Sequence, residues 1–187
     1  TDPFPFSACL LTKDDTRILP EWLAYHYTVM PLRNLIVAID PLSMTSPVPI
    51  LDKFRELGMN ITVWEDKDYN NDNKIPTPYD TPEEIHKAHR RRQLIFYNKC
   101  LMEFMNRGNH AWTMLIDTDE YLIFNYYQNN ERIVTPANVS QISSGEKLRT
   151  SLPRIGTMTV AQYLAKHGSA MEAYPCLTFP RIFFGAQ

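Results

Sequence analysis

Four short runs of apolar residues stand out along the first two thirds of the chain. They cover residues 6–12 (FSACLLT), 35–39 (LIVAI), 61–64 (ITVW) and 112–116 (WTMLI), and they are mostly continuous rather than alternating. Continuous apolar runs of this length are typical of strands buried on both faces of a parallel sheet. The pattern therefore predicts four buried strands.

Segments with a helical pattern lie between these runs. Apolar side chains within residues 18–30 repeat with the period of an α-helix, and residues 49–57 predict a second helix that ends at Gly58. A third helix is expected from about Thr81, which forms a capping box with Glu84, to about Asn106. Only the second half of this long helix is apolar, so we expect only that half to be deeply packed.

The remaining segments fit between or after these elements. Residues 66–80 and 125–156 are polar and predict irregular loops, a short helix is expected at 159–167, and an apolar, strand-like run covers 177–184. The alternation of strands and helices favours an α/β fold, an open and mostly parallel sheet with helices on both faces. The chain ends on an apolar run without a polar tail, which suggests a C-terminally truncated fragment of a longer protein.

Composition narrows the possible classes of protein. The chain has 187 residues, of which 44% are hydrophobic and 21% charged, as expected for one globular domain spanning residues 1–187. The formal net charge of −2 gives no cationic field that would attract nucleic acid or an anionic membrane. No apolar run reaches the length of a transmembrane helix, so no membrane segment is expected within this chain.

The three cysteines, Cys9, Cys100 and Cys176, are too few and too scattered to predict a disulfide scaffold or a zinc site. Cys9 and Cys100 lie in apolar surroundings and are interpreted as small core residues. His26 lies on an apolar helix face and is interpreted as a core histidine. His86 and His89 have no carboxylate or thiol at a suitable spacing, so we do not assign them to a metal.

Carboxylates follow all four predicted strands, at the edge where open α/β sheets bind ligands. Those after the first three strands, taken singly, are more typical of turn or cap residues than of a site. The fourth strand is followed by Asp117, Asp119 and Glu120 with no nearby cation in the sequence. Two charges about 4 Å apart repel by about 4 kcal/mol at an effective dielectric constant of 20, and a divalent cation reverses the sign of that energy. Oxygen ligands suit Mg²⁺ or Mn²⁺, so Asp117 and Asp119 are candidate metal ligands at a metal–diphosphate site, the alternative being a solvated acidic turn.

A run of three arginines, residues 90–92, lies on the long predicted helix. One interpretation is that an arginine of this run binds a substrate phosphate, for which its guanidinium group is well shaped. The other is that all three are solvated charges on an outer helix face, which is the commoner situation and the one we favour slightly.

Several motifs together resemble glycosyltransferases of the family 2-like and family 92-like groups. The resemblance is in sequence order and spans essentially the whole chain. The residues that carry it are Lys13-Asp14-Asp15, Leu19, Glu21-Trp22-Leu23 and Tyr25-His26 (K-N-E…L-x-E-W-L-x-Y-H in the family), Asp40 and Ser43 (D-N-x-S), Gln93, Tyr97-Asn98 and Cys100 (Q-x-x-x-Y-N-x-C), Asp117 to Leu122 (D-x-D-E-F-L), and Pro180-Arg181 with Phe184-Gly185 (P-R…F-G).

The resemblance implies a GT-A fold and a metal-dependent enzyme. It would transfer a sugar from a UDP- or GDP-sugar donor to a hydroxyl of a glycan, glycoprotein or glycolipid, with inversion at the anomeric carbon. In such enzymes a further metal ligand and the catalytic base commonly come from beyond the region present here, so no catalytic residue is assigned. The resemblance places Mn²⁺ or Mg²⁺ on Asp117 and Asp119. The nucleotide-sugar site would comprise Thr12, Asp15, Asp40, Arg92, Gln93 and Asp117.

Two alternatives to catalysis of glycosyl transfer stay open. One is a non-catalytic nucleotide- or glycan-binding module on the same scaffold. The other is a metal-dependent phosphoryl or nucleotidyl transferase, although the chain has no glycine-rich phosphate loop. Two sequons, at Asn60 and Asn138, allow a location in the Golgi lumen as part of a longer membrane-anchored protein, and Asn138 is the better acceptor candidate because Asn60 adjoins a predicted buried strand.

Overall fold

The structure is a computed structural model that describes residues 6–70, 77, 80–108 and 112–122. The chain divides into two compact units, Thr1–Leu122 and Ile123–Gln187, and every described residue belongs to the first. The elements and motifs predicted at 125–156, 159–167 and 177–184, together with Cys176 and the sequon at Asn138, lie outside the described residues.

The described unit is built on a four-stranded parallel sheet in the order β3-β2-β1-β4. The strands are β1 (Phe6–Thr12), β2 (Leu32–Ile39), β3 (Asn60–Trp64) and β4 (Thr113–Leu115). All four were predicted from the apolar runs, and β2 begins three residues earlier than expected. Every residue of β1 is buried, as a central strand covered on both faces requires.

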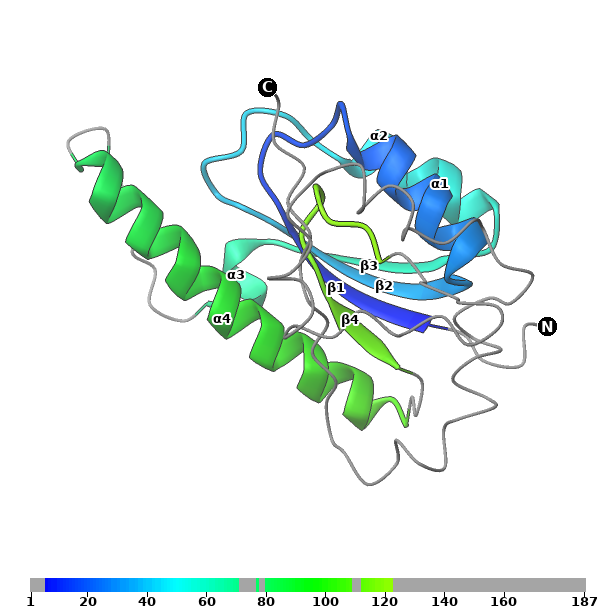
Figure 1. Cartoon of the computed structure of the whole chain (residues 1–187). Coiled ribbons are helices and arrows are strands. Elements are labelled where there is room, and N and C mark those ends of the chain that lie inside the picture. The colour runs from blue at the N-terminus through cyan, green and yellow to red at the C-terminus, as the bar shows by residue number, and fades with distance from the viewer. Residues whose placement is uncertain (1–5, 71–76, 78–79, 109–111, 123–187) are drawn as a thin grey trace, which may run out of the picture. The chain divides into compact units, whose positions relative to one another are not determined.

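Helices cover both faces of this sheet. Helices α1 (Leu19–Val29) and α2 (Val48–Glu56) lie on one side and α4 (Pro82–Asn106) on the other (Figure 1). The predicted capping box at Thr81 is present, and Gly58 ends α2 in the left-handed region, with φ +93°. A short helix, α3 (Asp66–Tyr69), lies where a loop was predicted, because Glu65 and Asp68 form a reciprocal capping box.

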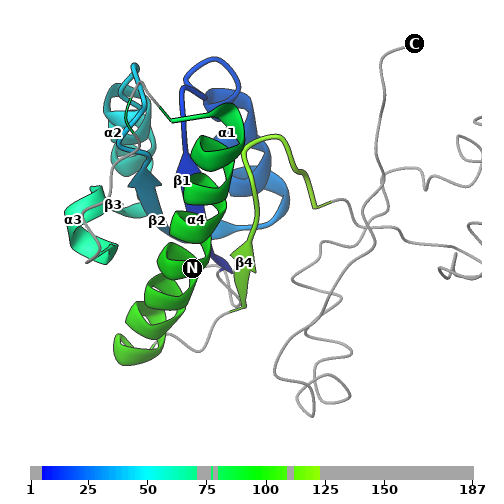
Figure 2. The same cartoon turned by 90° about the vertical axis from the view of Figure 1, so that its left-hand side faces the viewer.

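Helix α4 packs against β1, and Figure 2 shows it in front of the strands. The core on this side combines alternate residues of β1 and β2 with one face of α4, and only the second half of α4 is packed into it, as predicted. The buried residues of this core are Cys9, Leu11, Ile36, Ala38, Tyr69, Phe96, Cys100 and Phe104.

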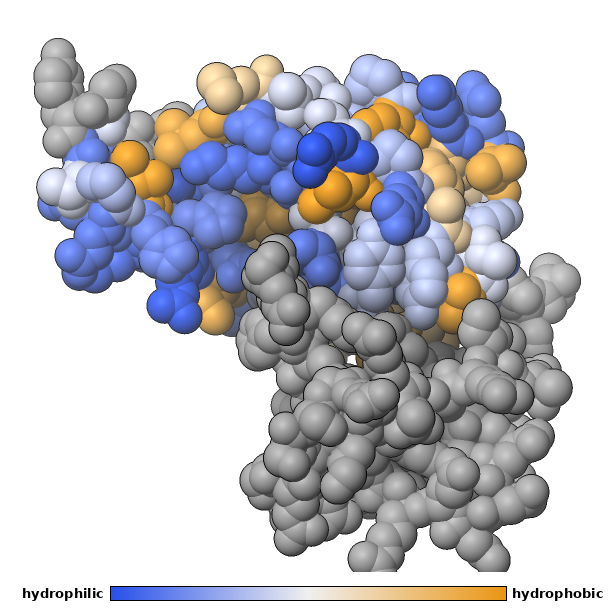
Figure 3. Space-filling model, turned by 45° about the horizontal axis from the view of Figure 1, so that its top comes forward, coloured by the Kyte–Doolittle hydropathy of each residue, from blue (hydrophilic) through white to orange (hydrophobic). Residues whose placement is uncertain are grey.

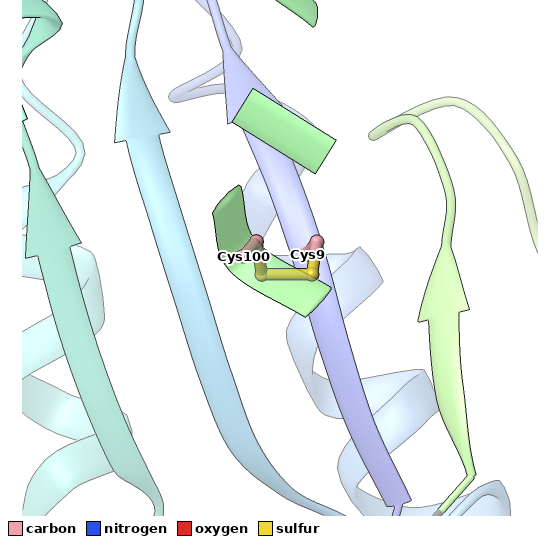
Figure 4. The surroundings of a disulfide bond; sticks show 2 residues. All are labelled: Cys9 and Cys100. Atoms are coloured by element: carbon pink, nitrogen blue, oxygen red, sulfur yellow. A yellow bond between two sulfur atoms is a disulfide. The ribbon is translucent and has the colours of Figure 1, made fainter. Parts of the chain in front are cut away.

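Cys9 and Cys100 form a disulfide, although the sequence analysis treats them as separate apolar residues. Both are fully buried, and their Cα atoms are 6.1 Å apart. Figure 4 shows the bond joining β1 to α4. The interpretation as small core residues is therefore corrected: the two side chains are in the core, but they are covalently paired and fix α4 on the central strand.

One face of the molecule shows no large hydrophobic patch among the coloured residues. On the face that Figure 3 presents, hydrophobic residues are scattered among hydrophilic ones.

Asn60, at the start of β3, is exposed. Burial was the reason for ranking this sequon below the one at Asn138, and the structure does not support that reason. None of the helices within the described residues is both long and apolar enough to cross a membrane.

Candidate functional site

One face of α4 brings polar side chains to the residues that follow the strands. The face comprises His89, Arg92, Gln93 and Tyr97, which are spaced by three, four and eight residues from the first and therefore lie on one side of a helix. Each of the four contacts an aspartate that follows β2, β3 or β4. We call these four residues the polar face of α4.

Asp40 directly follows β2 and pairs with His89. Its Oδ2 atom lies 2.8 Å from Nδ1 of His89, and its Oδ1 accepts a hydrogen bond of 2.9 Å from the backbone N–H of Leu42. Burial alone raises the pKa of Asp40, but these hydrogen bonds and the charge of Arg92 hold that pKa below its ordinary value. Asp40 is therefore ionised at neutral pH. Because an ionised carboxylate only accepts, Nδ1 of His89 carries the proton.

Asp66, after β3, pairs with Arg92. The Nε atom of Arg92 lies 3.2 Å from Oδ1 of Asp66, and the Arg92 side chain is 3% exposed. The interpretation of the arginine run as solvated charges is therefore wrong for Arg92, while Arg90 and Arg91 are exposed as expected. The signal that separates them is the spacing, because Arg92 shares its helix face with the core residues Phe96 and Cys100.

Asp117, which follows β4, is held by two donors of α4. Its Oδ1 accepts from Nε2 of Gln93 at 2.7 Å and from the hydroxyl of Tyr97 at 3.0 Å. Burial and the neighbouring Asp117 charge raise the pKa of Tyr97, so its hydroxyl keeps its proton and continues to donate. Within the described part of the chain, no residue donates to the second oxygen of Asp117, Oδ2.

Residues 117–120 form a tight turn that presents Asp119. The backbone N–H of Glu120 donates to the carbonyl of Asp117 at 3.1 Å, and the Glu120 side chain accepts from the Asp117 N–H at 3.3 Å. Asp119 is exposed at this turn, and no described residue hydrogen-bonds or ion-pairs with its carboxylate. The three acidic side chains thus differ: Glu120 stabilises the turn, whereas Asp117 and Asp119 keep oxygen atoms for other partners.

Helix α1 holds the residues after this turn. Trp22 and Tyr25 donate to the backbone carbonyls of Glu120 and Leu122, each at 3.0 Å. His26 is fully buried and stacks on Tyr121, with ring centroids 5.7 Å apart. The prediction that His26 is a core residue is confirmed, whereas the contact between α1 and the 117–122 segment was not predicted.

The residues after β1 have local roles. Asp14, at φ 57°, accepts hydrogen bonds from the backbone N–H groups of Met44 and Thr45 at 2.7 and 2.9 Å, and so orders the loop after β2. Asp15 accepts from the Lys13 N–H at 3.0 Å, and the buried Thr12 donates to the Ala38 carbonyl at 3.3 Å. Thr12 thus bonds to the neighbouring strand β2, and Asp15 bonds within its own turn.

The predicted site residues divide into two groups. The structure brings Asp40, Arg92, Gln93 and Asp117 together along the polar face of α4, as the preceding contacts show. It places Thr12 and Asp15 at and just after the end of β1, where the Thr12 carbonyl accepts a hydrogen bond of 2.9 Å from the backbone N–H of Asp40. His89 was not predicted, and it joins the first group through Asp40.

The donor set fits a hard divalent cation only in part. Among the described residues, no group of three or more His, Cys, Asp or Glu side chains is placed to hold a metal ion. Asp117 and Asp119 offer carboxylate oxygens, which Mg²⁺ and Mn²⁺ prefer, and ions of this kind commonly use one or two carboxylates together with substrate phosphate. The residues present therefore fit a cation that is shared with a bound diphosphate rather than held by protein alone.

Comparison with known proteins identifies the family. The model of the family described as Glycosyltransferase family 92 matches residues 45–163, which is more than half of the chain. No significant match was found among curated proteins or among solved structures. The chain belongs to glycosyltransferase family 92, and its parallel sheet with helices on both faces agrees with the GT-A-like α/β fold that the sequence predicts.

Proposed function

We propose, from this membership of glycosyltransferase family 92, that the protein transfers a sugar from a UDP- or GDP-sugar to a hydroxyl of a glycan, glycoprotein or glycolipid, with inversion and with dependence on Mn²⁺ or Mg²⁺. The observation that carries the proposal is the environment of Asp117. Its carboxylate follows β4, one oxygen is fixed by Gln93 and Tyr97, and the exposed Asp119 lies two residues away.

The position of Asp117 in the sheet supports a nucleotide site. The chain passes from β1 outward to β2 and β3, and then returns to place β4 on the other side of β1. The strand order therefore reverses between β1 and β4, and open α/β sheets bind ligands outside the carboxyl ends of the strands at such a point. Asp117 follows one of these two strands, which suits contact with the diphosphate of a donor.

The oxygen atoms of Asp117 and Asp119 would hold the cation. A bound cation would neutralise the negative charge on the departing nucleoside diphosphate. The protein supplies a fixed orientation: Gln93 and Tyr97 orient one carboxylate oxygen of Asp117, and the turn at residues 117–120 keeps Asp119 exposed.

The disulfide between Cys9 and Cys100 supports a location in the secretory pathway. Disulfides persist in oxidising compartments and are rare in the cytosol. We propose the Golgi lumen, as part of a longer membrane-anchored protein.

The test is release of nucleoside diphosphate. The full-length protein is incubated with Mn²⁺, a panel of nucleotide sugars and candidate glycan acceptors. We expect release from one donor, a loss of at least 100-fold in Asp119→Ala, and no change in the control Asp52→Ala, which removes an exposed carboxylate of α2. Donor binding without release would indicate a binding module, and release of phosphate or pyrophosphate would indicate a phosphoryl or nucleotidyl transferase.

A further inference from the structure

We propose that His89 binds a ribose hydroxyl of the donor through Nε2, and that Asp40 is a positioning residue that acts on the donor only through His89. The inference rests on the proposed function. It changes the role that the resemblance gives to Asp40, and it adds a residue that neither the sequence motifs nor the family match assigns.

Asp40 is poorly placed to contact a donor itself. Its side chain is 1% exposed, and its two oxygens already accept hydrogen bonds from Leu42 N–H and from His89. A carboxylate in this state is a strong acceptor for the proton on Nδ1 of an imidazole ring and fixes the ring's orientation. Asp40 therefore acts at the edge of the sheet by orienting the His89 ring.

His89 has the exposure and the chemistry that Asp40 lacks. Its side chain is 29% exposed, and within the described part of the chain Asp40 is the partner of its ring, through Nδ1. Because Nδ1 faces Asp40, Nε2 is the ring nitrogen that can meet a ligand. A ribose hydroxyl, which both donates and accepts hydrogen bonds, can bind to it.

The position of His89 along the sheet indicates that it contacts the nucleoside part of the donor. Asp40 follows β2, which flanks β1 on the side away from β4. Along α4, Gln93 and Tyr97, which hold Asp117, lie about 6 Å and about 12 Å from His89 at a rise of 1.5 Å per residue. A nucleotide with its diphosphate at Asp117 would extend across β1 toward β2, and its ribose would then lie near His89.

The test variant is His89→Asn in the full-length protein. The asparagine amide can still donate to Asp40 from about the position of Nδ1, but the atom at the position of Nε2 is removed. We expect the donor KM to rise about tenfold, the effect of one lost hydrogen bond, with kcat within about threefold of wild type. His86→Asn is the matched control, because His86 is exposed one turn earlier on α4, and it should change neither constant.

Deoxy donors give a second readout, and its wild-type part does not depend on the folding of a variant. With wild type, one of the two deoxy donors, 2′-deoxy or 3′-deoxy, should give a kcat/KM about tenfold lower than the normal donor. With His89→Asn, that same deoxy donor should give the same kcat/KM as the normal donor. His89→Gln, which can place an amide oxygen near the position of Nε2, should recover part of the loss seen in His89→Asn.

The outcomes separate the two proposals. If wild type releases no nucleoside diphosphate from any donor, the proposed function fails and this inference with it. If wild type is active and His89→Asn leaves KM unchanged, or lowers kcat alone, the inference fails while the proposed function stands. Full sensitivity of His89→Asn to both deoxy donors would also overturn it.

Discussion

Trp22 donates its indole N–H to the backbone carbonyl of Glu120 at 3.0 Å, across 98 residues of sequence. Tyr25, three residues further along α1, donates its hydroxyl to the backbone carbonyl of Leu122, also at 3.0 Å. The residues after β4 are not part of the sheet. These two bonds from α1 therefore help to fix the backbone of the acidic turn, residues 117–120, and of the residues after it. The motif residues of α1 thus act on the candidate metal ligands through the backbone.

This relationship predicts different effects for two tyrosines of α1. Tyr25→Phe and Tyr27→Phe each remove one hydroxyl that donates to a backbone carbonyl at 3.0 Å, of Leu122 and Leu57 respectively. Each change should cost about 0.5–1.5 kcal/mol of unfolding free energy. Only Tyr25→Phe should lower kcat/KM, by roughly three- to tenfold, and raise the Mn²⁺ concentration needed for half-maximal activity, because only Leu122 adjoins the acidic turn. Equal activity of the two variants would contradict a role for α1 in the site.

Arg92 is expected to stabilise the fold, whereas Arg90 is not. Arg92→Met leaves Asp66 without its buried cation, and removal of one partner of a buried ion pair costs about 3–5 kcal/mol. We expect about 3 kcal/mol in chemical denaturation, because Asn70 also donates to Asp66 at 3.2 Å. Arg90→Met, two residues earlier and exposed, should change stability by less than about 0.5 kcal/mol. A similar loss in both variants would refute the buried pair.

The four strands and the three longer helices of the described unit could be predicted because their signals are local, whereas the short helix α3 was missed. The apolar run of β1, the capping box at Thr81 and the stop at Gly58 each depend on neighbours within a few residues. Pairing between elements has no such signal. His89 and Asp40 are 49 residues apart, and nothing in either segment alone indicates that they meet.

A stronger prediction of the site could have come from the period of α4. Gln93 and Tyr97 were recognised as motif residues, and Phe96, Cys100 and Phe104 form the buried stripe of the same helix. Extending that stripe toward the N-terminus reaches Arg92 and His89, which marks them as inward-facing. The inward-facing positions were not recognised because three consecutive arginines suggested a solvated helix face.

The disulfide should be both present and stabilising in protein made in an oxidising compartment. A digest without reductant should yield a linked peptide pair containing Cys9 and Cys100 in the mass spectrum. The bond closes a loop with a sequence separation of 91, for which the chain-entropy model gives about 4–5 kcal/mol. Cys9→Ala/Cys100→Ala should lose up to that amount, and Cys176→Ala should keep the linked pair. Recovery of Cys9 as a free thiol would contradict the bond and the lumenal location that it supports.

His26 predicts a loss of stability in mild acid. Burial lowers the pKa of His26 from 6.5 to about 4, and the hydrogen bond between Nδ1 and the Trp22 carbonyl, at 2.8 Å, only partly opposes this. The folded protein therefore keeps His26 neutral where the unfolded chain protonates it. Since the unfolded state binds more protons between about pH 6.5 and pH 4, unfolding free energy falls as the pH is lowered through that window, by on the order of 3 kcal/mol in total.

The variant His26→Gln isolates this contribution, because it keeps an N–H donor and does not titrate. Its unfolding free energy, measured by denaturant at pH 7 and at pH 4.5, should fall less between the two values than that of wild type, even if it is lower at pH 7. His86→Gln, at an exposed position, should keep the wild-type dependence. An equal fall in wild type and His26→Gln would mean that His26 is not held neutral by burial.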